Sequence, residues 1–292
     1  MHVTVHWFVE PATSILTRIG TVTAPVQLSV NGIETKSSDE QFEALMSGTT
    51  DAAVTAMDNV MDWNLRPGAG DLRIVAQIER TTPLSLVGTA ATTDVRSLKD
   101  GTVLVDASAN GFVVAARALL DECGLDSGSY TLKPAGGVRE RCETLLAGGG
   151  DATLLGPPFD GMAVARGARV LARVNDHYPA LPRQGLVVRQ SSYDRVRAHV
   201  VAWLAAMEHA RAWAQTNKNA AVVRLAATGI PGPLAETLIS FIPSSLVPDR
   251  DGIALLIAQR QRAGLRGGNV NYSDLVDSDL LESVASSLEP NR

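Results

Sequence analysis

The sequence has few of the residues that a nucleic-acid-binding protein requires. Aromatic residues make up 4% of the chain, too few for the stacking platforms that hold single-stranded nucleic acid. Lysine and arginine together number 26 against 31 acidic residues, and no dense basic run is present. The cationic surface that a phosphate backbone needs is therefore missing, and we expect no nucleic-acid partner.

Cysteines and catalytic motifs are also scarce. The two cysteines, Cys123 and Cys142, are too few for a disulfide framework and form no CxxC pair. Both lie in helical patterns, and we interpret them as unpaired thiols. The motifs HExxH and GxSxG are absent, as are the Walker lysine and the spaced glycines of a dinucleotide loop. The sequence therefore indicates no metal and no cofactor.

Long hydrophobic runs are absent as well. No stretch approaches the ~18 apolar residues that a membrane-spanning helix requires, so we expect none. The first residues, MHVTVHWFVE, lack the basic region, apolar segment and cleavage site of a secretion signal. As written, the sequence predicts a cytoplasmic protein, or a periplasmic or extracellular one if a leader has been removed.

The most informative feature that is present is an internal repeat. Residues 39–52 read DEQFEALMSGTTDA, and residues 139–152 read RERCETLLAGGGDA. The identical pairs are Glu40/Glu140, Glu43/Glu143, Leu45/Leu145, Gly48/Gly148, Asp51/Asp151 and Ala52/Ala152. Each copy predicts a short amphipathic helix that ends at a left-handed glycine, then a tight turn and an apolar strand. Because strand and helix patterns also precede each copy, the order β-α-β-α-β occurs twice.

This order predicts an α/β fold with two lobes, each a mostly parallel sheet flanked by helices. The length of 292 residues also favours two domains. Residues 72–90 and 184–189 are expected to be extended connections, and 192–287 to be helical. We assign 1–86 and 187–292 to the first lobe and 87–186 to the second. Ligands of open α/β sheets bind beyond the carboxyl ends of the strands, which predicts a site in a cleft between the lobes.

Two aromatic side chains end the first predicted strand. In one interpretation His6 hydrogen-bonds or exchanges protons with a ligand and Trp7 stacks on it. In the other, Trp7 belongs to the core and His6 is an ordinary edge residue. Their position at the end of a strand favours the first interpretation, while a single histidine by itself favours the second.

The loops after the repeated strands provide further candidates. Asp58 and Asn59 follow the first copy, and Pro158, Phe159 and Asp160 follow the second. We predict that these residues contact a ligand. Asp58 and Asp160 are also candidates for an acid–base pair, a role that would require different environments for the two carboxylates.

The segment VDASANGF contains the sharpest local signal. Asp106 ends a strand, and Ser108, Asn110 and Gly111 lead into a helix without a bulky side chain at its first turn. Free backbone N–H groups at such a helix start attract anions. An ordinary amino-terminal cap by Ser108 or Asn110 is the alternative, and both can hold together.

Four segments resemble the type II periplasmic-binding-protein fold, in its SsuA/THI5-like branch for sulfonates, nitrate and thiamine pyrimidines. They read FEALMSGTTDAAV, SLKDGTVLVDASANGF, RCETLLAGGGDATLLGPPFDGMAVARGARVL and NYSDLVDSDLLESV. The resemblance implies that a small anionic or polar molecule binds between two lobes and is delivered to a membrane permease. Some relatives are cytoplasmic enzymes, but the nucleophilic cysteine of the desulfinases is replaced here by the stretch His6-Trp7-Phe8.

Two functions remain open from the sequence. The first is a solute-binding protein for a small organic anion, with an ABC permease as partner if the chain is exported. The second is a cytoplasmic decarboxylase, lyase or hydrolase that uses the same cleft, with His6 as acid or base and Asp58 or Asp160 orienting it. The base rate of the fold and the lack of a catalytic motif favour binding.

Overall fold

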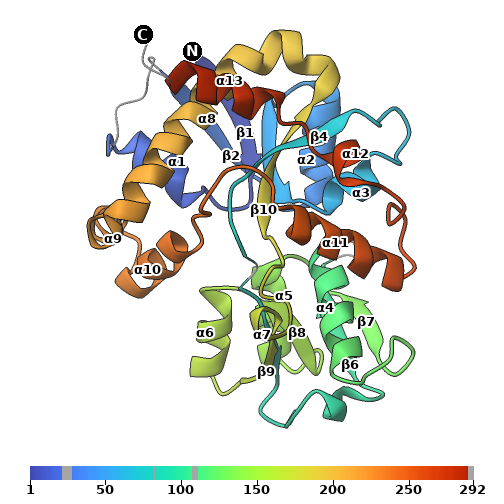
Figure 1. Ribbon diagram of the computed structural model, residues 1–292. Helices are drawn as coiled ribbons and strands as arrows, with labels where there is room; N and C mark the ends of the chain where they lie inside the picture. Colours follow the sequence, from blue (N-terminus) through green and yellow to red (C-terminus); the bar gives the residue numbers. More distant parts are fainter. Residues whose placement is uncertain (22–27, 82, 107–110, 289–292) are drawn as a thin grey trace. The chain divides into compact units, whose positions relative to one another are not determined.

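A computed structural model describes residues 1–21, 28–81, 83–106 and 111–288 and contains two compact units (Figure 1). Unit 1 comprises Met1–Arg80, Pro182–Ile253 and Val270–Arg292, and unit 2 comprises Thr81–Leu181 and Ala254–Asn269. The crossings fall a few residues before those expected from the sequence. Ala254–Asn269, expected in the first lobe, groups with unit 2 because the last turns of a helix that starts in unit 1 contact unit 2.

Among the described residues, unit 1 contains a five-stranded sheet in the order β2-β1-β3-β10-β4. Its strands are β1 (His2–Trp7), β2 (Ser29–Glu34), β3 (Ala52–Ala56), β4 (Leu72–Gln77) and β10 (Gln184–Arg189). Strand β1 is parallel to β2 and β3, whereas β10 is antiparallel to β3 and β4. All strands but β10 therefore share one direction, and β10 is the segment that returns from unit 2.

The described part of unit 2 has a sheet of the same design, in the order β7-β6-β8-β5-β9. Its strands are β5 (Ser85–Gly88), β6 (Thr102–Val105), β7 (Thr131–Pro134), β8 (Ala152–Leu155) and β9 (Arg169–Arg173). Strand β6 is parallel to β7 and β8, and β5 is antiparallel to β8 and β9. The crossing strand, β5 here and β10 in unit 1, occupies the same place in both sheets.

Helices occupy segments between the strands of both units and much of the carboxyl-terminal part of the chain. Those of unit 1 are α1 (Ala12–Arg18), α2 (Ser38–Ser47), α3 (Asn59–Trp63), α8 (Tyr193–Thr216), α9 (Lys218–Ala226), α10 (Gly232–Ser240), α12 (Tyr272–Leu275) and α13 (Asp279–Leu288). Those of unit 2 are α4 (Gly111–Glu122), α5 (Val138–Leu146), α6 (Phe159–Ala165) and α7 (Val174–His177), and α11 (Arg250–Arg262) begins in unit 1 and ends in unit 2. None of the described helices combines the length and apolar character needed to cross a membrane.

Equivalent aspartates join the repeated turn to strand β1 in unit 1 and to strand β6 in unit 2. Asp51 Oδ2 accepts a hydrogen bond from Thr4 N at 2.8 Å, and Asp151 Oδ2 accepts one from Thr102 N at 2.7 Å. In return, the backbone N–H groups of Asp51 and Asp151 donate to the carbonyls of Thr4 and Thr102. The identity of these aspartates in the two copies thus has a structural cause.

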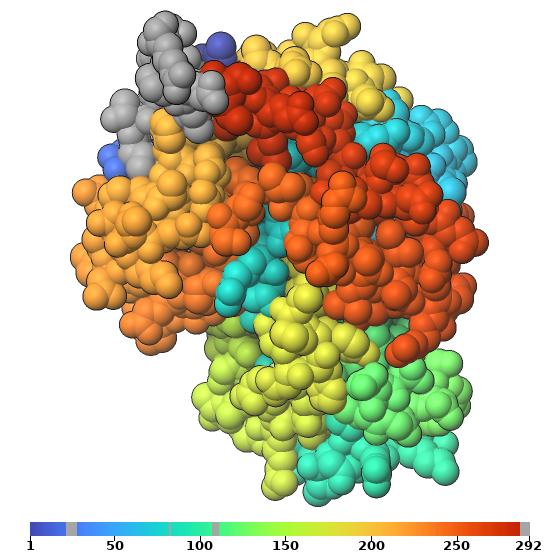
Figure 2. All heavy atoms as spheres, viewed as in Figure 1, coloured from blue at the N-terminus to red at the C-terminus, as the bar shows by residue number. Residues whose placement is uncertain are grey.

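The core of unit 1 lies between its sheet and α8. Val3, Val5 and Trp7 alternate with partly exposed residues along β1 and are buried. The Trp7 and Trp203 ring centroids lie 6.3 Å apart, and Trp203 is fully buried. Each such side chain contributes about 1.5–3 kcal/mol when it is removed from water. In Figure 2 the carboxyl-terminal helices, from gold to red, form much of the visible surface of unit 1.

The carboxyl-terminal part of the chain differs from the sequence prediction, because residues 241–249 and 263–271 are not helical. A single helix was expected from Tyr272 onward, but α12 and α13 are separate elements. Between them, Val276 forms a β-bridge with Ile74, and Asp277 Oδ2 accepts a hydrogen bond from Tyr193 Oη at 2.9 Å. These contacts draw the backbone out of the helix, a tertiary effect that periodicity does not reveal.

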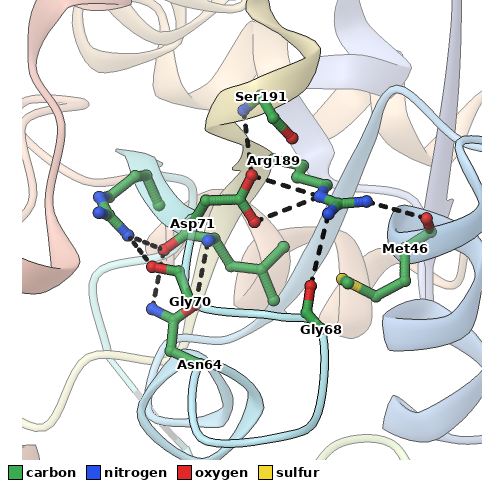
Figure 3. A network of polar contacts seen from close by, with 9 residues as sticks. Met46, Asn64, Gly68, Gly70, Asp71, Arg189 and Ser191 are labelled. Carbon is green, nitrogen blue, oxygen red and sulfur yellow. Dashed lines mark hydrogen bonds and ion pairs between the residues drawn. The ribbon is translucent and has the colours of Figure 1, made fainter.

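A polar network joins β4 and β10 at the amino edge of the sheet (Figure 3). Arg189 Nε lies 3.2 Å from Asp71 Oδ1, and the same guanidinium donates to the carbonyl of Met46 at 3.0 Å. Asp71 also accepts from Ser191 N at 3.1 Å. These hydrogen bonds lower the pKa of Asp71 although its burial opposes them. The network stabilises the amino edge and leaves the opposite, carboxyl edge as the place for a site.

Candidate functional site

The carboxyl ends of the parallel strands carry the predicted site residues in both units. In unit 1, His6 lies near the end of β1, and Asp58 follows β3 in the same sheet. In unit 2, Asp106 directly follows β6, and Pro158 follows β8. The topology therefore gives each unit one polar carboxyl edge, and each edge is described below by itself.

His6 is partly buried on β1, between Ile33 of β2 and Ala53 of β3. Its Nδ1 atom is buried and forms no hydrogen bond within the described part of the chain. Burial lowers the pKa of His6, and the nearby charge of Glu40 opposes that shift. The lowered pKa makes neutral imidazole the main form at neutral pH, able to accept or donate one hydrogen bond at each nitrogen.

The structure agrees with the interpretation in which Trp7 belongs to the core. Its side chain is 5% exposed and lies against Trp203. The ring also fills the space above Gly32 so closely that a Cβ atom on this glycine would overlap it. The structure therefore places the Trp7 ring in the core of unit 1, where side-chain alternation along β1 directs it.

Asp58 and Asn59 lie at the start of α3 and are almost fully buried, at 1% and 5% exposure. Asn59 Nδ2 donates to Thr55 Oγ1 at 2.9 Å, which ties the loop to the end of β3. Asp58 also has a polar partner. The Asn59 side chain therefore already has a partner within unit 1.

The predicted anion pocket of unit 2 is described in part. Ser108 and Asn110 lie outside the described residues, whereas Gly111 is the first residue of α4, as predicted. Asp106 is partly exposed at the end of β6 and forms an ion pair with Arg141, with 3.5 Å between Oδ1 and Nη1. The carboxylate of Asp106 therefore has a cation beside it.

The loop after β8 is more exposed than its counterpart in unit 1. Pro158 precedes α6, and Phe159 begins it. Asp160 accepts hydrogen bonds from Ser85 Oγ at 3.3 Å and from the N–H of Gly161 at 2.8 Å. Asp58 and Asp160 thus lie in equivalent loops, one in each unit.

Arg141 is a residue that the sequence reasoning missed. It lies on α5 and is 2% exposed. Its guanidinium donates to the carbonyls of Gly136 at 3.0 Å and Leu154 at 3.4 Å, and it lies beside Asp106. These partners belong to three neighbouring strands or the residues just after them, so the buried cation sits at the carboxyl edge of unit 2.

The repeat itself contains the signal for this residue. Gln41 occupies the equivalent position on α2, is fully buried, and donates through Nε2 to Val54 O at 3.0 Å. Arg141 makes the same contact with Leu154. Two buried polar side chains at one repeat position point to a polar edge in each unit, and only the second copy adds a charge.

Burial lowers the pKa of Arg141, while the charges of Asp106 and Glu140 oppose this shift. A guanidinium nevertheless stays protonated in proteins, so unit 2 has a buried positive charge. In unit 1, Gln41 Oε1 is buried and has no hydrogen-bond partner in the described residues. The two edges therefore differ: that of unit 2 has the ion pair of Arg141 and Asp106, and that of unit 1 has neutral hydrogen-bonding groups.

No three histidine, cysteine or acidic side chains gather as a potential metal site within the described ranges. A scan of the sequence against models of protein families finds no match, and a search of curated proteins also finds none. Sequence comparison alone thus gives no family for this chain.

Solved structures, in contrast, match over almost the full length. The ligand-binding component of an ABC-type import system from Staphylococcus aureus, with zinc bound, has a TM-score of 0.80 at 13% identity, covering 97% of this chain and 99% of that one. The nitrate-binding protein NrtA from Synechocystis PCC 6803 has a TM-score of 0.75 at 13% identity, covering 99% and 89%. The aliphatic sulphonate-binding protein SsuA from Escherichia coli has a TM-score of 0.70 at 15% identity, covering 95% and 92%.

Proposed function

We propose that this chain is a solute-binding protein for a small organic anion. It has the fold of periplasmic substrate-binding proteins, as the sequence resemblance implied. Solved proteins of this fold are described as binding sulphonate and nitrate. The observation that carries the proposal for this chain is the buried Arg141 at the carboxyl edge of unit 2.

The chemistry of the two edges defines the ligand. Arg141 presents a rigid set of N–H donors that suits a carboxylate, sulfonate or nitrate oxygen. Asp106 beside it favours a ligand that also has a hydrogen-bond donor. His6 and Gln41 supply neutral groups without a partner on Nδ1 and Oε1 within the described part of unit 1. A small organic molecule with one anionic end and polar groups elsewhere fits this set.

The chain crosses between the two units four times, after Arg80, Leu181, Ile253 and Asn269. The proposed function implies an ABC permease as partner and a periplasmic or extracellular location. The enzyme alternative lacks comparable support, because His6 Nδ1 has no carboxylate bound to it among the described residues.

Calorimetric titration with ethanesulfonate, nitrate and benzoate tests the proposal, with Arg141→Gln as the key variant. This change installs the residue that the first copy of the repeat already holds, so the hydrogen bond to Leu154 can persist while the charge is lost. We expect the dissociation constant of the bound anion to rise about 10- to 100-fold, the usual effect of losing a charged hydrogen bond.

The matched control is Arg169→Gln, which removes an exposed arginine on β9 of the same unit. It should leave the dissociation constant unchanged. Equal affinity of the Arg141→Gln variant and the parent protein would contradict the role of Arg141. Chemical conversion of the bound anion during the titration would favour the enzyme alternative instead.

A further inference from the structure

A pocket lies at the surface of unit 2, away from its carboxyl edge. It has a volume of about 160 Å³ and lies between the last turns of α4, the loop that follows, and the end of α11. Helix α4 starts at the carboxyl edge with Gly111, whereas the pocket begins at Arg117. At 1.5 Å per residue, the pocket is roughly 9–15 Å along the helix from that edge.

The strongest evidence for a ligand in this pocket is Gln259 of α11. The residue lines the pocket and is only 6% exposed, yet neither Oε1 nor Nε2 has a hydrogen-bond partner in the described part of the chain. A buried amide left without partners destabilises a protein, and such groups are rare in native structures. A ligand with both a donor and an acceptor would satisfy the two atoms.

Charged groups of both signs lie around this amide. Arg117 lines the pocket, and its buried Nε has no hydrogen-bond partner within the described ranges. On the neighbouring loop, Asp126 offers a carboxylate. Arg262 and Asp121 complete the charged lining and face each other, with 3.6 Å between Nη1 and Oδ2. The formal charges of these four side chains cancel, so the pocket favours neither a simple anion nor a simple cation.

We propose that this pocket binds a small zwitterion of the α-amino-acid type. The carboxylate of the ligand would accept hydrogen bonds from Arg117, and its ammonium group would donate to Asp126. The same two groups would bind the Gln259 amide, with the carboxylate accepting from Nε2 and the ammonium donating to Oε1. The volume suits a ligand of few heavy atoms. Two of the acidic residues that line the pocket, Asp121 and Asp126, are exposed to solvent, so a ligand has access to it.

This site is independent of the proposed anion site. All its lining residues belong to unit 2, and Arg141 is not among them. Occupation of the pocket joins α4 to α11, the helix that begins in unit 1 and ends in unit 2. The zwitterion therefore binds at a different place in unit 2 from the anion that we propose at Arg141.

Calorimetric titration of the full chain with L-alanine tests this inference, with propionate and ethylamine as the anion-only and cation-only probes. We expect saturable binding of L-alanine and at least about tenfold weaker binding of the two single-charge probes. Arg117→Met and Gln259→Leu should each weaken L-alanine binding at least about tenfold, since each removes hydrogen bonds to the ligand. Gln259→Leu keeps a side chain of similar size, so the helix should fold as before.

The control variants are Arg96→Met, an exposed arginine elsewhere in unit 2, and Arg141→Gln at the carboxyl edge. Both should bind L-alanine as the parent protein does. Absence of L-alanine binding up to about 10 mM, equal binding of propionate, or unchanged affinity in Arg117→Met and Gln259→Leu would each overturn the proposal. Because Arg141→Gln is predicted to change only anion binding, failure of one site is distinguishable from failure of the other.

Discussion

At the residue scale, a buried ion pair joins the segment through which the chain first leaves unit 1 to the segment through which it first returns. Glu79 Oε2 and Arg183 Nε are 3.2 Å apart, and their side chains are 11% and 13% exposed. Beside them, the backbone N–H groups of Ile78 and Glu79 both donate to the carbonyl of Gln184. Burial raises the pKa of Glu79, and the positive charge of Arg183 only partly offsets this shift. The charged form of the Glu79 carboxylate is therefore stabilised by Arg183.

Removal of Arg183 should show how far the stability of the protein depends on this ion pair. We expect Arg183→Met to lower the free energy of unfolding by about 3 kcal/mol at pH 7, because it leaves a buried carboxylate unpaired. A raised folded-state pKa means that the stability contributed by Glu79 is present below its unfolded pKa and lost as pH rises through the folded value. The loss in Arg183→Met should therefore grow between pH 4 and pH 8 in urea-unfolding measurements.

The double variant Glu79→Gln/Arg183→Met provides the control. With both charges gone, most of the lost stability should return, and the added pH dependence should disappear. If Arg183→Met matched the parent protein at every pH, the pair would have no role in the stability of the connecting segments.

The positions of some single residues could be predicted from the sequence, and those of others could not. The offset repeat predicted the strand ends, and with them the positions of His6, Asp58 and Asp106 at the carboxyl edges. It could not show that Trp7 turns into the core or that Arg141 is buried, because both facts depend on which side of an element faces the sheet. The unpartnered amide of Gln259 depends on contacts between segments far apart in sequence, which no local pattern contains.

At the element scale, the two copies of the repeat end their helices in the same way. Gly48 and Gly148 have φ values of 73° and 77°, in the left-handed region predicted for both. A Cβ atom at Gly148 would meet no atom within 4 Å, and one at Gly48 would meet only the end of the Arg195 side chain. Backbone strain, and not crowding, therefore determines the effect of a substitution at either position.

We expect Gly48→Ala and Gly148→Ala each to lower the free energy of unfolding by about 1–2 kcal/mol. The matched control is Gly161→Ala in α6, where no positive φ is found and no atom lies within 4 Å of an added Cβ. It should be neutral or stabilise by up to about 1 kcal/mol, since alanine favours a helix interior. Chemical denaturation monitored by circular dichroism measures all three, and an unaffected Gly48→Ala variant would contradict the strain argument.

Elements were more predictable than their assignment to units. The alternation of strand and helix patterns is a local property, so the order of elements in both halves followed from the sequence. The grouping of Ala254–Asn269 with unit 2 and the break at Val276 depend on tertiary contacts. The sequence of an amphipathic helix indicates that its apolar face packs against another element, but it does not indicate which element.

At the scale of the whole molecule, each unit has its own core. The cluster around Trp203 belongs to unit 1, and the cluster around Leu104 and Leu145 belongs to unit 2. We therefore expect calorimetric unfolding without ligand to depart from a single two-state transition. The glycine variants assign the transitions: Gly48→Ala should lower the midpoint of one, and Gly148→Ala that of the other.

An anion bound at Arg141 should raise the midpoint of the transition of unit 2, because it binds only the folded protein. L-alanine in the pocket of unit 2 should act first on the transition that Gly148→Ala shifts. A single transition in which both glycine variants lower the same midpoint equally would show that the units unfold together.

The interrupted layout of unit 1 also has a consequence for the order of events during synthesis. The sheet of unit 2 is drawn from one continuous stretch, Ser85 to Arg173, whereas β4 of unit 1 pairs only with β10 among the described strands. Strand β10 and helix α8, which covers the core of unit 1, leave the ribosome later. Because domains fold as units while the chain emerges, the inserted half can complete its sheet while the half that contains the amino terminus still waits for its last strand.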